Sequence, residues 1–143
     1  MNDDLRRAIR TVARLARVLE RSGDELSLPQ YRVLDMVARG DERASMLSAR
    51  LALAKPTITA VVDGLVERGW LVRSEVAGDR RAIRLSITPA GKKALRAAEV
   101  VMADRLRPIL ERAADPEHAL AVLSALEDAL DQAAGERASA PAR

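Results

Sequence analysis

The segment over residues 45–74 reads SMLSARLALAKPTITAVVDGLVERGWLVRS. Its apolar residues recur at spacings of three and four, which predicts two short helices over 45–52 and 55–68 with a tight connection. Pro56 suits the first turn of the second helix, where its missing N–H leaves no hydrogen bond unmade. Gly69 suits the position just after that helix. The segment therefore predicts a helix-turn-helix.

The residues that follow change from helical to alternating period. Alternation over 70–74 and 82–88 predicts two short strands, joined by a charged turn over 75–81. A helix-turn-helix followed by a hairpin is the winged form of the DNA-reading unit. Its second helix fits the major groove, and an arginine on the hairpin tip suits the negative potential of a narrow minor groove.

Two further helices are expected on the N-terminal side of this unit. The first spans about 3–20 and stops at Ser22-Gly23-Asp24. The second opens at Leu26-Ser27-Leu28-Pro29, with Ser27 or Leu28 near the cap and Pro29 in its first turn, and carries its own apolar stripe. The order of elements so far is helix, helix, helix-turn-helix and hairpin.

Two more helices are expected on the C-terminal side. Thr88 caps a long helix that runs to about Ala113, and Pro108 should kink or split it. Asp115-Pro116 opens the last helix. From Gly135 onward the apolar periodicity is lost, which predicts a disordered tail.

These elements predict a mainly α fold with a small two- or three-stranded β wing. The first and last helices have long apolar stripes that the remaining residues cannot easily cover, and a two-fold dimer would cover them. The expected divisions are an N-terminal dimerisation helix over 1–25, a winged helix-turn-helix DNA-binding domain over 26–90, C-terminal dimerisation helices over 91–134 and a disordered tail over 135–143.

The distribution of charge supports nucleic acid as a partner. The net charge is only +3, and a GC-rich genome could account for the preference for arginine over lysine. However, residues 39–96 hold 12 basic and 6 acidic side chains, whereas residues 97–143 hold 5 basic and 9 acidic ones. Codon usage alone would not place the positive charge in the middle of the chain, on the winged unit.

The composition also excludes several classes of function. The chain of 143 residues fits one domain, and without cysteine it can form neither disulfides nor thiolate metal sites. It has one histidine, His118, expected at the surface, and no cluster of nucleophile, base and orienting group. We therefore expect no enzyme, no metal and no cofactor. With no long apolar run and no signal-peptide stretch, we expect a cytoplasmic protein.

An ordered set of short motifs gives a more specific indication. They are Leu47-Ser48-Ala49-Arg50-Leu51, Lys55-Pro56-Thr57-Ile58-Thr59, Val61-Val62-Asp63-Gly64-Leu65, Glu67-Arg68-Gly69-Trp70-Leu71-Val72-Arg73, Asp79-Arg80-Arg81 and Ile87-Thr88-Pro89-Ala90-Gly91. Together they resemble the MarR (multiple antibiotic resistance regulator) family of winged-helix transcription factors, over about residues 26–95.

The resemblance implies a homodimer whose terminal helices interlock and which binds pseudo-palindromic operators in double-stranded DNA. It implies a repressor that is relieved by a small, often aromatic or anionic ligand. The absence of cysteine excludes the thiol-based peroxide-sensing branch of that family. A winged-helix interaction module without operator binding stays open as an alternative function, and a small enzyme is a remote one.

The resemblance and the expected elements together assign candidate site residues. Thr57, Thr59 and Ala60 should face base edges, and Lys55 a phosphate. Arg81 matches the wing arginine of the family, and Asp79 would orient its guanidinium by a hydrogen bond. Further candidates for phosphate contacts are Arg50, Arg73, Arg80 and Arg84. Ser45 could cap the first helix of the motif or contact a phosphate.

Candidates for effector contacts come from the first two expected helices. Arg14 or Arg17 could pair with an anionic effector. Tyr31 could contact a ligand, although packing in the core is its favoured role. Trp70 is expected to pack in the core rather than to bind a ligand.

Overall fold

The computed structural model describes residues 2–20, 25–40 and 42–139. The predicted break at Ser22-Gly23-Asp24 lies outside these residues. The described elements confirm a mainly α fold with a small β wing. In chain order they are α1 (Asp3–Leu19), α2 (Leu28–Arg39), β1 (Glu42–Arg43), α3 (Ala44–Leu51), α4 (Lys55–Glu67), β2 (Leu71–Val76), β3 (Asp79–Ile87), α5 (Pro89–Leu110) and α6 (Pro116–Ser139).

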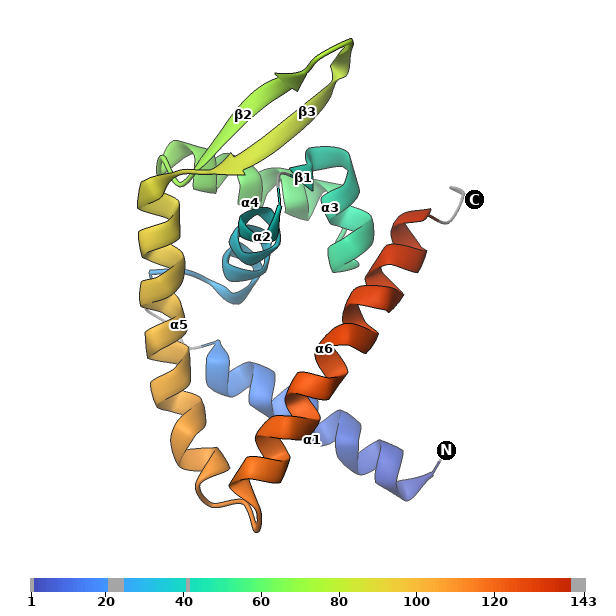
Figure 1. Cartoon of the computed structure of the whole chain (residues 1–143), viewed down its shortest axis with the longest axis vertical. Helices are drawn as coiled ribbons and strands as arrows, with labels where there is room; N and C mark the ends of the chain where they lie inside the picture. The colour runs from blue at the N-terminus through green and yellow to red at the C-terminus, as the bar shows by residue number, and fades with distance from the viewer. Residues whose placement is uncertain (1, 21–24, 41, 140–143) are drawn as a thin grey trace.

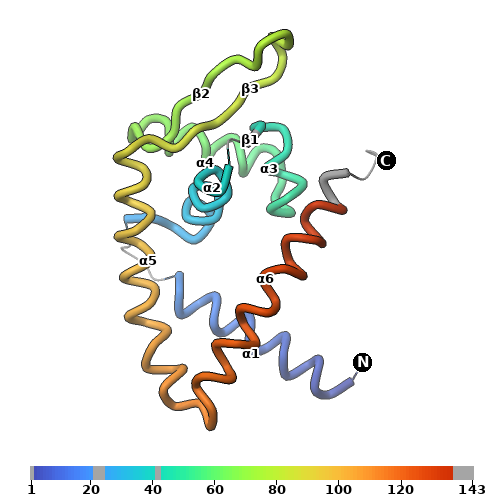
Figure 2. Tube along the Cα trace, viewed as in Figure 1, coloured from blue at the N-terminus to red at the C-terminus, as the bar shows by residue number. Residues whose placement is uncertain are grey.

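The helices form a V-shaped frame around the winged unit. Helices α5 and α6 are the two arms of the V, and they meet at the turn over residues 111–115 (Figure 1). The winged unit, from α2 to β3, lies at the open end, with the hairpin of β2 and β3 projecting outward. Helix α1 crosses near the closed end, so it lies far from the hairpin (Figure 2).

The core belongs mostly to the winged unit and is almost wholly aliphatic. Leu34, Leu47, Leu65 and Leu85 are each 0% exposed, and they come from α2, α3, α4 and β3. Trp70 is 9% exposed in the same cluster, which confirms its expected packing role. Burial of this apolar surface holds the two helices of the helix-turn-helix against the sheet.

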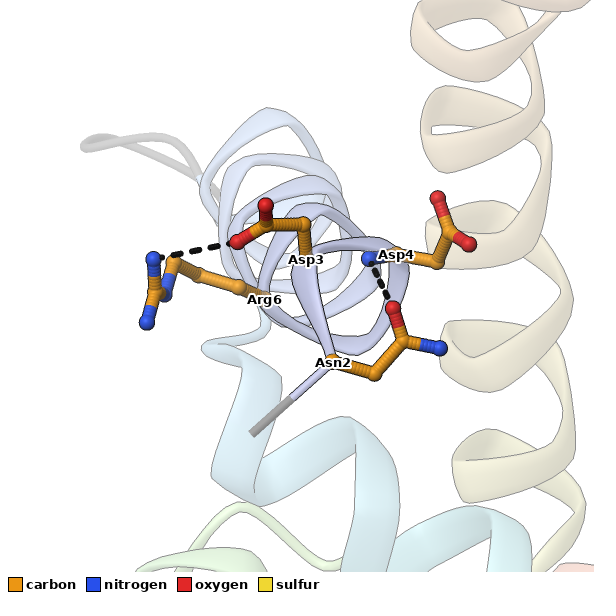
Figure 3. Close-up of polar contacts among 4 residues, drawn as sticks. All are labelled: Asn2, Asp3, Asp4 and Arg6. Atoms are coloured by element: carbon orange, nitrogen blue, oxygen red, sulfur yellow. Dashed lines mark hydrogen bonds and ion pairs between the residues drawn. The ribbon is translucent and has the colours of Figure 1, made fainter.

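The beginnings of α1 and α2 are fixed by side chains that the sequence places there. Asn2 accepts a hydrogen bond from the Asp4 amide at 3.0 Å, and Arg6 pairs with Asp3 at 3.2 Å (Figure 3). Ser27, one of the two expected cap residues, forms a reciprocal capping box with Gln30.

The end of α4 is fixed by a Schellman motif at Gly69. This glycine has a φ of 71°, and its amide donates to the Val66 carbonyl at 2.9 Å. The Trp70 amide donates to the Leu65 carbonyl, also at 2.9 Å. Both bonds satisfy carbonyls that the helix leaves open. The motif confirms the predicted helix end and turns the chain sharply into β2.

A second junction joins the sheet to α5 through Thr88 and Gly91. The Thr88 hydroxyl donates to the Gly69 carbonyl at 2.6 Å and accepts from the Gly91 amide at 3.0 Å. A Cβ on Gly91 would lie 2.2 Å from the Trp70 carbonyl oxygen. Only glycine lets the first turn of α5 approach so closely, which gives the Thr-x-x-Gly motif a physical reason.

The sheet has three strands in the order β1-β3-β2, with both pairings antiparallel. The strands extend well into the predicted turn over 75–81, and only Ala77 and Gly78 connect them. Gly78 has a φ of 82°, a conformation that glycine adopts without strain. The predicted turn was too long because charged residues there belong to the exposed ends of the strands.

Two predictions about the C-terminal helices are wrong. Pro108 does not split α5, because it lies in the last turn and the helix ends two residues later, at Leu110. The expected tail over 135–143 is helical as far as Ser139, and residues 140–143 lie outside the described residues. Gly135 costs about 1 kcal/mol in helix propensity relative to Ala, but its neighbours Ala133 and Ala134 are strong helix formers.

Charged side chains also hold α6 to α2. Arg39 pairs with Asp35 on its own helix at 3.1 Å, with Glu127 at 2.9 Å and with Asp131 at 3.7 Å. The two partners on α6 are one turn apart, so a single guanidinium serves both. These contacts connect the winged unit to the arm formed by α6.

Large apolar side chains remain exposed on α1, α5 and α6. None of the residues of α1 is buried, and Leu5, Ile9 and Val12 are 53–65% exposed. The exposed members on the other two helices are Val100, Val101, Ile109, Leu120, Val122, Leu123, Leu126 and Leu130. Within the described ranges, no helix is both long enough and apolar enough to cross a membrane.

Candidate nucleic-acid interface

The N-terminal turns of α4 present short side chains to solvent. Thr57, Thr59 and Ala60 are exposed, whereas Ile58 between them is 4% exposed and anchors the helix in the core. The Thr59 hydroxyl donates to the Lys55 carbonyl at 3.0 Å, so it offers only its acceptor lone pairs to a ligand. The structure therefore brings the expected base-reading residues together on one outward surface.

The first turn of α4 also lacks a side-chain cap. Its N-cap residue is Ala54, which makes no side-chain hydrogen bond, and Lys55 beside it is exposed. The leading amides of α4 consequently keep their unmet hydrogen-bonding capacity and the positive end of the helix dipole. This electrostatic character suits the approach of a polyanion.

An ion pair ties α4 to the sheet. The Arg73 guanidinium on β2 contacts the Asp63 carboxylate on the exposed surface of α4. Arg73 was expected to contact a phosphate, and the structure instead gives it a protein partner. Asp63 is a site residue that the sequence analysis missed. Two features of the sequence could have indicated the pair. Asp63 lies at an exposed helical position, and the chain reverses soon after it, at Gly69, so that the next strand returns along α4.

The wing tip carries two exposed arginines in an irregular part of β3. Glu75 pairs with Ile83 and the next residue, Val76, pairs with Asp79, so residues 80–82 are out of register with β2. Such a bulge re-aims side chains locally. Arg80 and Arg81 are both exposed there.

Asp79 does not orient the Arg81 guanidinium as expected. Its carboxylate accepts a hydrogen bond from the Arg81 main-chain amide at 3.0 Å. The described residues include no ion pair between the two side chains. The short aspartate side chain reaches the amide two residues ahead, as in an Asx turn, and so it shapes the backbone of the tip.

The other expected phosphate contacts lie in different places. Arg84 is exposed on β3, and Ser45 is exposed as the second residue of α3. Ser45 does not cap that helix, because Arg43 holds the N-cap position. Arg50 is half-buried and lines a groove with α6 residues Asp131 and Ala134, so it is turned toward α6 rather than toward α4.

The three expected effector contacts do not form one site within a protomer. Arg14 is exposed on α1, and Arg17 lines an open groove with Asp104, Arg105 and Pro108 of α5. Tyr31 does not line that groove. It is half-buried on α2 and packs against the core, which is the role that the sequence favoured.

The surroundings of Tyr31 are negative rather than positive. Burial raises the pKa of the Tyr31 hydroxyl above its ordinary value, and the carboxylates of Asp35, Glu99 and Glu127 raise it further. Arg39 acts in the opposite direction. These carboxylates would repel an anionic ligand, so the surroundings of Tyr31 do not favour an anionic effector there.

A small apolar cavity lies between the start of α2 and the middle of α5. It has a volume of about 90 Å³ and is lined mainly by aliphatic side chains, including Leu26, Ala98 and Met102. Ligand pockets are usually about 300–1,000 Å³. The protomer alone therefore offers no enclosed space of ordinary ligand size at this point.

Comparison with known proteins finds a family match over the winged unit. Residues 24–82 match the model of the MarR family. The chain is 38% identical over 72 residues to the uncharacterized HTH-type transcriptional regulator YpoP of Bacillus subtilis, a match that covers 50% of this chain and 51% of that protein. The chain thus spans about half the length of this curated relative.

Solved structures resemble the chain over almost its whole length. The transcriptional regulator BldR from Sulfolobus solfataricus has a TM-score of 0.71 and 25% identity, covering 90% of this chain and 99% of that one. The transcriptional repressor CouR, bound to a 23-mer DNA duplex, has a TM-score of 0.67 and 25% identity, covering 87% of this chain and 88% of that one. The fold is therefore that of winged-helix transcriptional regulators, terminal helices included.

Proposed function

We propose that the chain is a homodimeric, DNA-binding transcriptional regulator of the MarR family. The observation that carries the proposal is the outward surface of α4, where Thr57, Thr59 and Ala60 are exposed on an uncapped first turn. The arginine-tipped hairpin extends from the sheet that packs on the same helix. In this proposal α4 enters the major groove and Arg81 the neighbouring minor groove.

The side chains on α4 favour limited reading of base edges. Threonine offers one hydroxyl, and Ala60 offers only a methyl group that suits the methyl of thymine. By contrast, Lys55, Arg80, Arg81 and Arg84 are exposed and positive. We therefore expect contacts to phosphates and the shape of the duplex to supply most of the affinity, which makes binding strongly dependent on salt.

The dimer is supported by the apolar side chains that α1, α5 and α6 leave exposed. A contiguous apolar surface on a soluble protomer usually marks an interface, and a two-fold dimer would match a two-fold operator. We assign residues 1–25 and 91–134 to dimerisation and residues 26–90 to DNA binding. Of the described part of the last helix, no residue is buried within the protomer.

Sedimentation velocity tests the dimer. Leu126 is 50% exposed on α6, and a Leu126→Asp substitution would place a charge in the proposed interface. We expect a dimer for the original protein and a monomer for the variant. Val72 is 48% exposed on the wing, so Val72→Asp is a matched control that should remain dimeric. A monomeric original protein would contradict the proposal.

The regulator is further proposed to be a repressor released by a small-molecule effector. The support for this part is the resemblance to the family, because the apolar cavity beside α5 is smaller than an ordinary ligand pocket. An effector site would therefore be completed by the second protomer. A melting-temperature screen with phenolic acids, followed by release of bound DNA, tests it. No shift and no release in this ligand class would count against it.

A mobility-shift titration at several salt concentrations tests DNA binding itself. The probe is a duplex selected by the protein from a random library, and a duplex of scrambled sequence is the control. We expect preference for the selected duplex, a steep loss of affinity with salt, and weaker binding by Thr57→Ala and Arg81→Ala. Unchanged binding by both variants would instead favour a winged-helix protein that acts through other partners.

A further inference from the structure

Two arginines stand directly opposite each other on the outer surface of the small sheet. Strand β1 is only two residues long, and in its antiparallel pairing with β3 the Cα partner of Arg43 is Arg84. Directly paired residues project to the same side of a sheet. The neighbour of Arg84, Leu85, is 0% exposed, so Arg84 and Arg43 lie on the side away from the core, and both are exposed.

The same row continues onto the third strand. Ser74 on β2 is the Cα partner of Arg84 on its other side, and Ser74 is also exposed. One row across the sheet therefore consists of Arg43, Arg84 and Ser74, and we call it the arginine row. It presents two guanidinium groups and one hydroxyl, which are donors that suit the oxygens of a phosphate.

The arginine row is electrostatically unfavourable in the protein alone. Like charges placed directly opposite each other on two strands repel. Arg43 is also the N-cap residue of α3, where it makes no side-chain cap bond and lies at the positive end of the helix dipole. In the described part of the chain, neither Arg43 nor Arg84 has an ion-pair partner that would offset the repulsion between the two guanidinium groups.

We propose that Arg43 and Arg84 together bind one phosphate of the DNA backbone. The inference rests on the proposed function and extends it to Arg43, whose position in β1 gives it a role beside the wing. A phosphate between the two guanidiniums would turn their mutual repulsion into attraction on both sides, and Ser74 would donate a third hydrogen bond. The row thus positions the sheet on the duplex without reading its sequence.

Opposite effects on folding and on binding distinguish this role from a structural one. Removing either arginine relieves the repulsion, so Arg43→Gln and Arg84→Gln should melt at the original temperature or higher. The same variants should bind the selected duplex several-fold more weakly. The double variant should lose about one unit of the slope of log K against log salt per protomer, and hence about two units for a bound dimer, because each protomer loses one phosphate contact.

The control is Arg7→Gln, which removes the same charge from an exposed position on α1, far from the wing (Figure 1). It should keep the original slope and affinity nearly unchanged. If the double variant also keeps them while Arg81→Ala binds weakly, the inference is wrong and the proposed function stands. If the original protein binds no duplex at all, both are wrong.

A second experiment distinguishes binding of a DNA phosphate from binding of the free phosphate ion. Melting temperatures are compared in inorganic phosphate and in chloride at equal ionic strength. We expect no difference at millimolar phosphate, because two exposed side chains hold a small anion weakly against water. A rise in phosphate that the double variant abolishes, together with unchanged affinity of that variant for the duplex, would overturn the assignment to DNA.

Discussion

The Arg73 guanidinium on β2 is ion-paired with the Asp63 carboxylate on the exposed surface of α4. This contact neutralises the acidic residue closest in sequence to the proposed base-reading positions of α4. It also assigns Arg73 to the orientation of that helix instead of to a phosphate. Orientation of α4 and direct contact with a phosphate predict different duplex affinities when Asp63 is replaced together with Arg73.

Replacing Arg73 tests this assignment. Arg73→Gln would leave the Asp63 carboxylate uncompensated near the DNA backbone, and we expect roughly three- to tenfold weaker duplex binding. The double variant with Asp63→Asn should recover most of the affinity in a mobility-shift titration. A double variant as weak as Arg73→Gln would show that Arg73 contacts phosphate directly. Both side chains are partly exposed, so the pair should contribute about 0.2–1 kcal/mol to folding.

Gly91 should tolerate no side chain. A Cβ at this position would lie 2.2 Å from the Trp70 carbonyl oxygen and 2.8 Å from Ile87 Cγ1. Because the nearest atom belongs to the main chain, the first turn of α5 would have to shift. We expect Gly91→Ala to lower the free energy of unfolding by about 1–3 kcal/mol in urea titrations. An unchanged midpoint would mean that the junction is not as close as described.

Gly64 should respond in the opposite direction, and it is the matched glycine control. A Cβ there would meet only Gln30 Nε2, at 4.0 Å, which is an ordinary contact. Since glycine weakens the middle of a helix, Gly64→Ala should raise the free energy of unfolding by about 0.5–1 kcal/mol. The same urea titration measures it, and a loss of stability would show that α4 is more crowded than the structure indicates.

Tyr31 should titrate above its ordinary pKa of 10.0, because it is partly buried and close to three carboxylates. It is the only tyrosine, so the ultraviolet absorbance of phenolate reports on it alone. A pKa raised on folding means that the folded state holds the proton more tightly. The associated stability is therefore complete below pH 10 and is lost as the pH rises through the folded-state pKa.

The Tyr31→Phe variant is the control for that titration. It should remove the part of the stability loss above pH 10 that belongs to Tyr31, while the remaining alkaline loss persists. A folded-state midpoint at or below 10.0 would contradict the described burial of the hydroxyl among Asp35, Glu99 and Glu127.

Local signals in the sequence were enough to predict most of the winged unit. Gly69, Ser27 and Thr88 each have a backbone role that depends on the few residues around them, and the structure places all three as expected. The exposed positions of Thr57 and Thr59 follow from helical periodicity once Ile58 is buried. Helix caps, helix ends and exposed helical positions could therefore be predicted, because they depend on residues close in sequence.

Features that depend on distant residues could not be predicted. The pair of Asp63 and Arg73 forms only because the chain reverses at Gly69, and the opposition of Arg43 and Arg84 depends on sheet register. β1 is too short to show any alternation. The continuation of α6 past Gly135 was missed because glycine and the loss of apolar periodicity both argue locally against a helix.

The most direct test of the central claim is selection of DNA by the purified protein from a random duplex library, followed by sequencing. We expect an enriched inverted repeat with half-sites one helical turn apart, bound by one dimer. Thr57→Ala should select a less defined sequence at the centre of each half-site, while its repeat spacing is kept. A library that shows no enrichment, or equal affinity for selected and scrambled duplexes, would contradict a sequence-specific dimeric regulator.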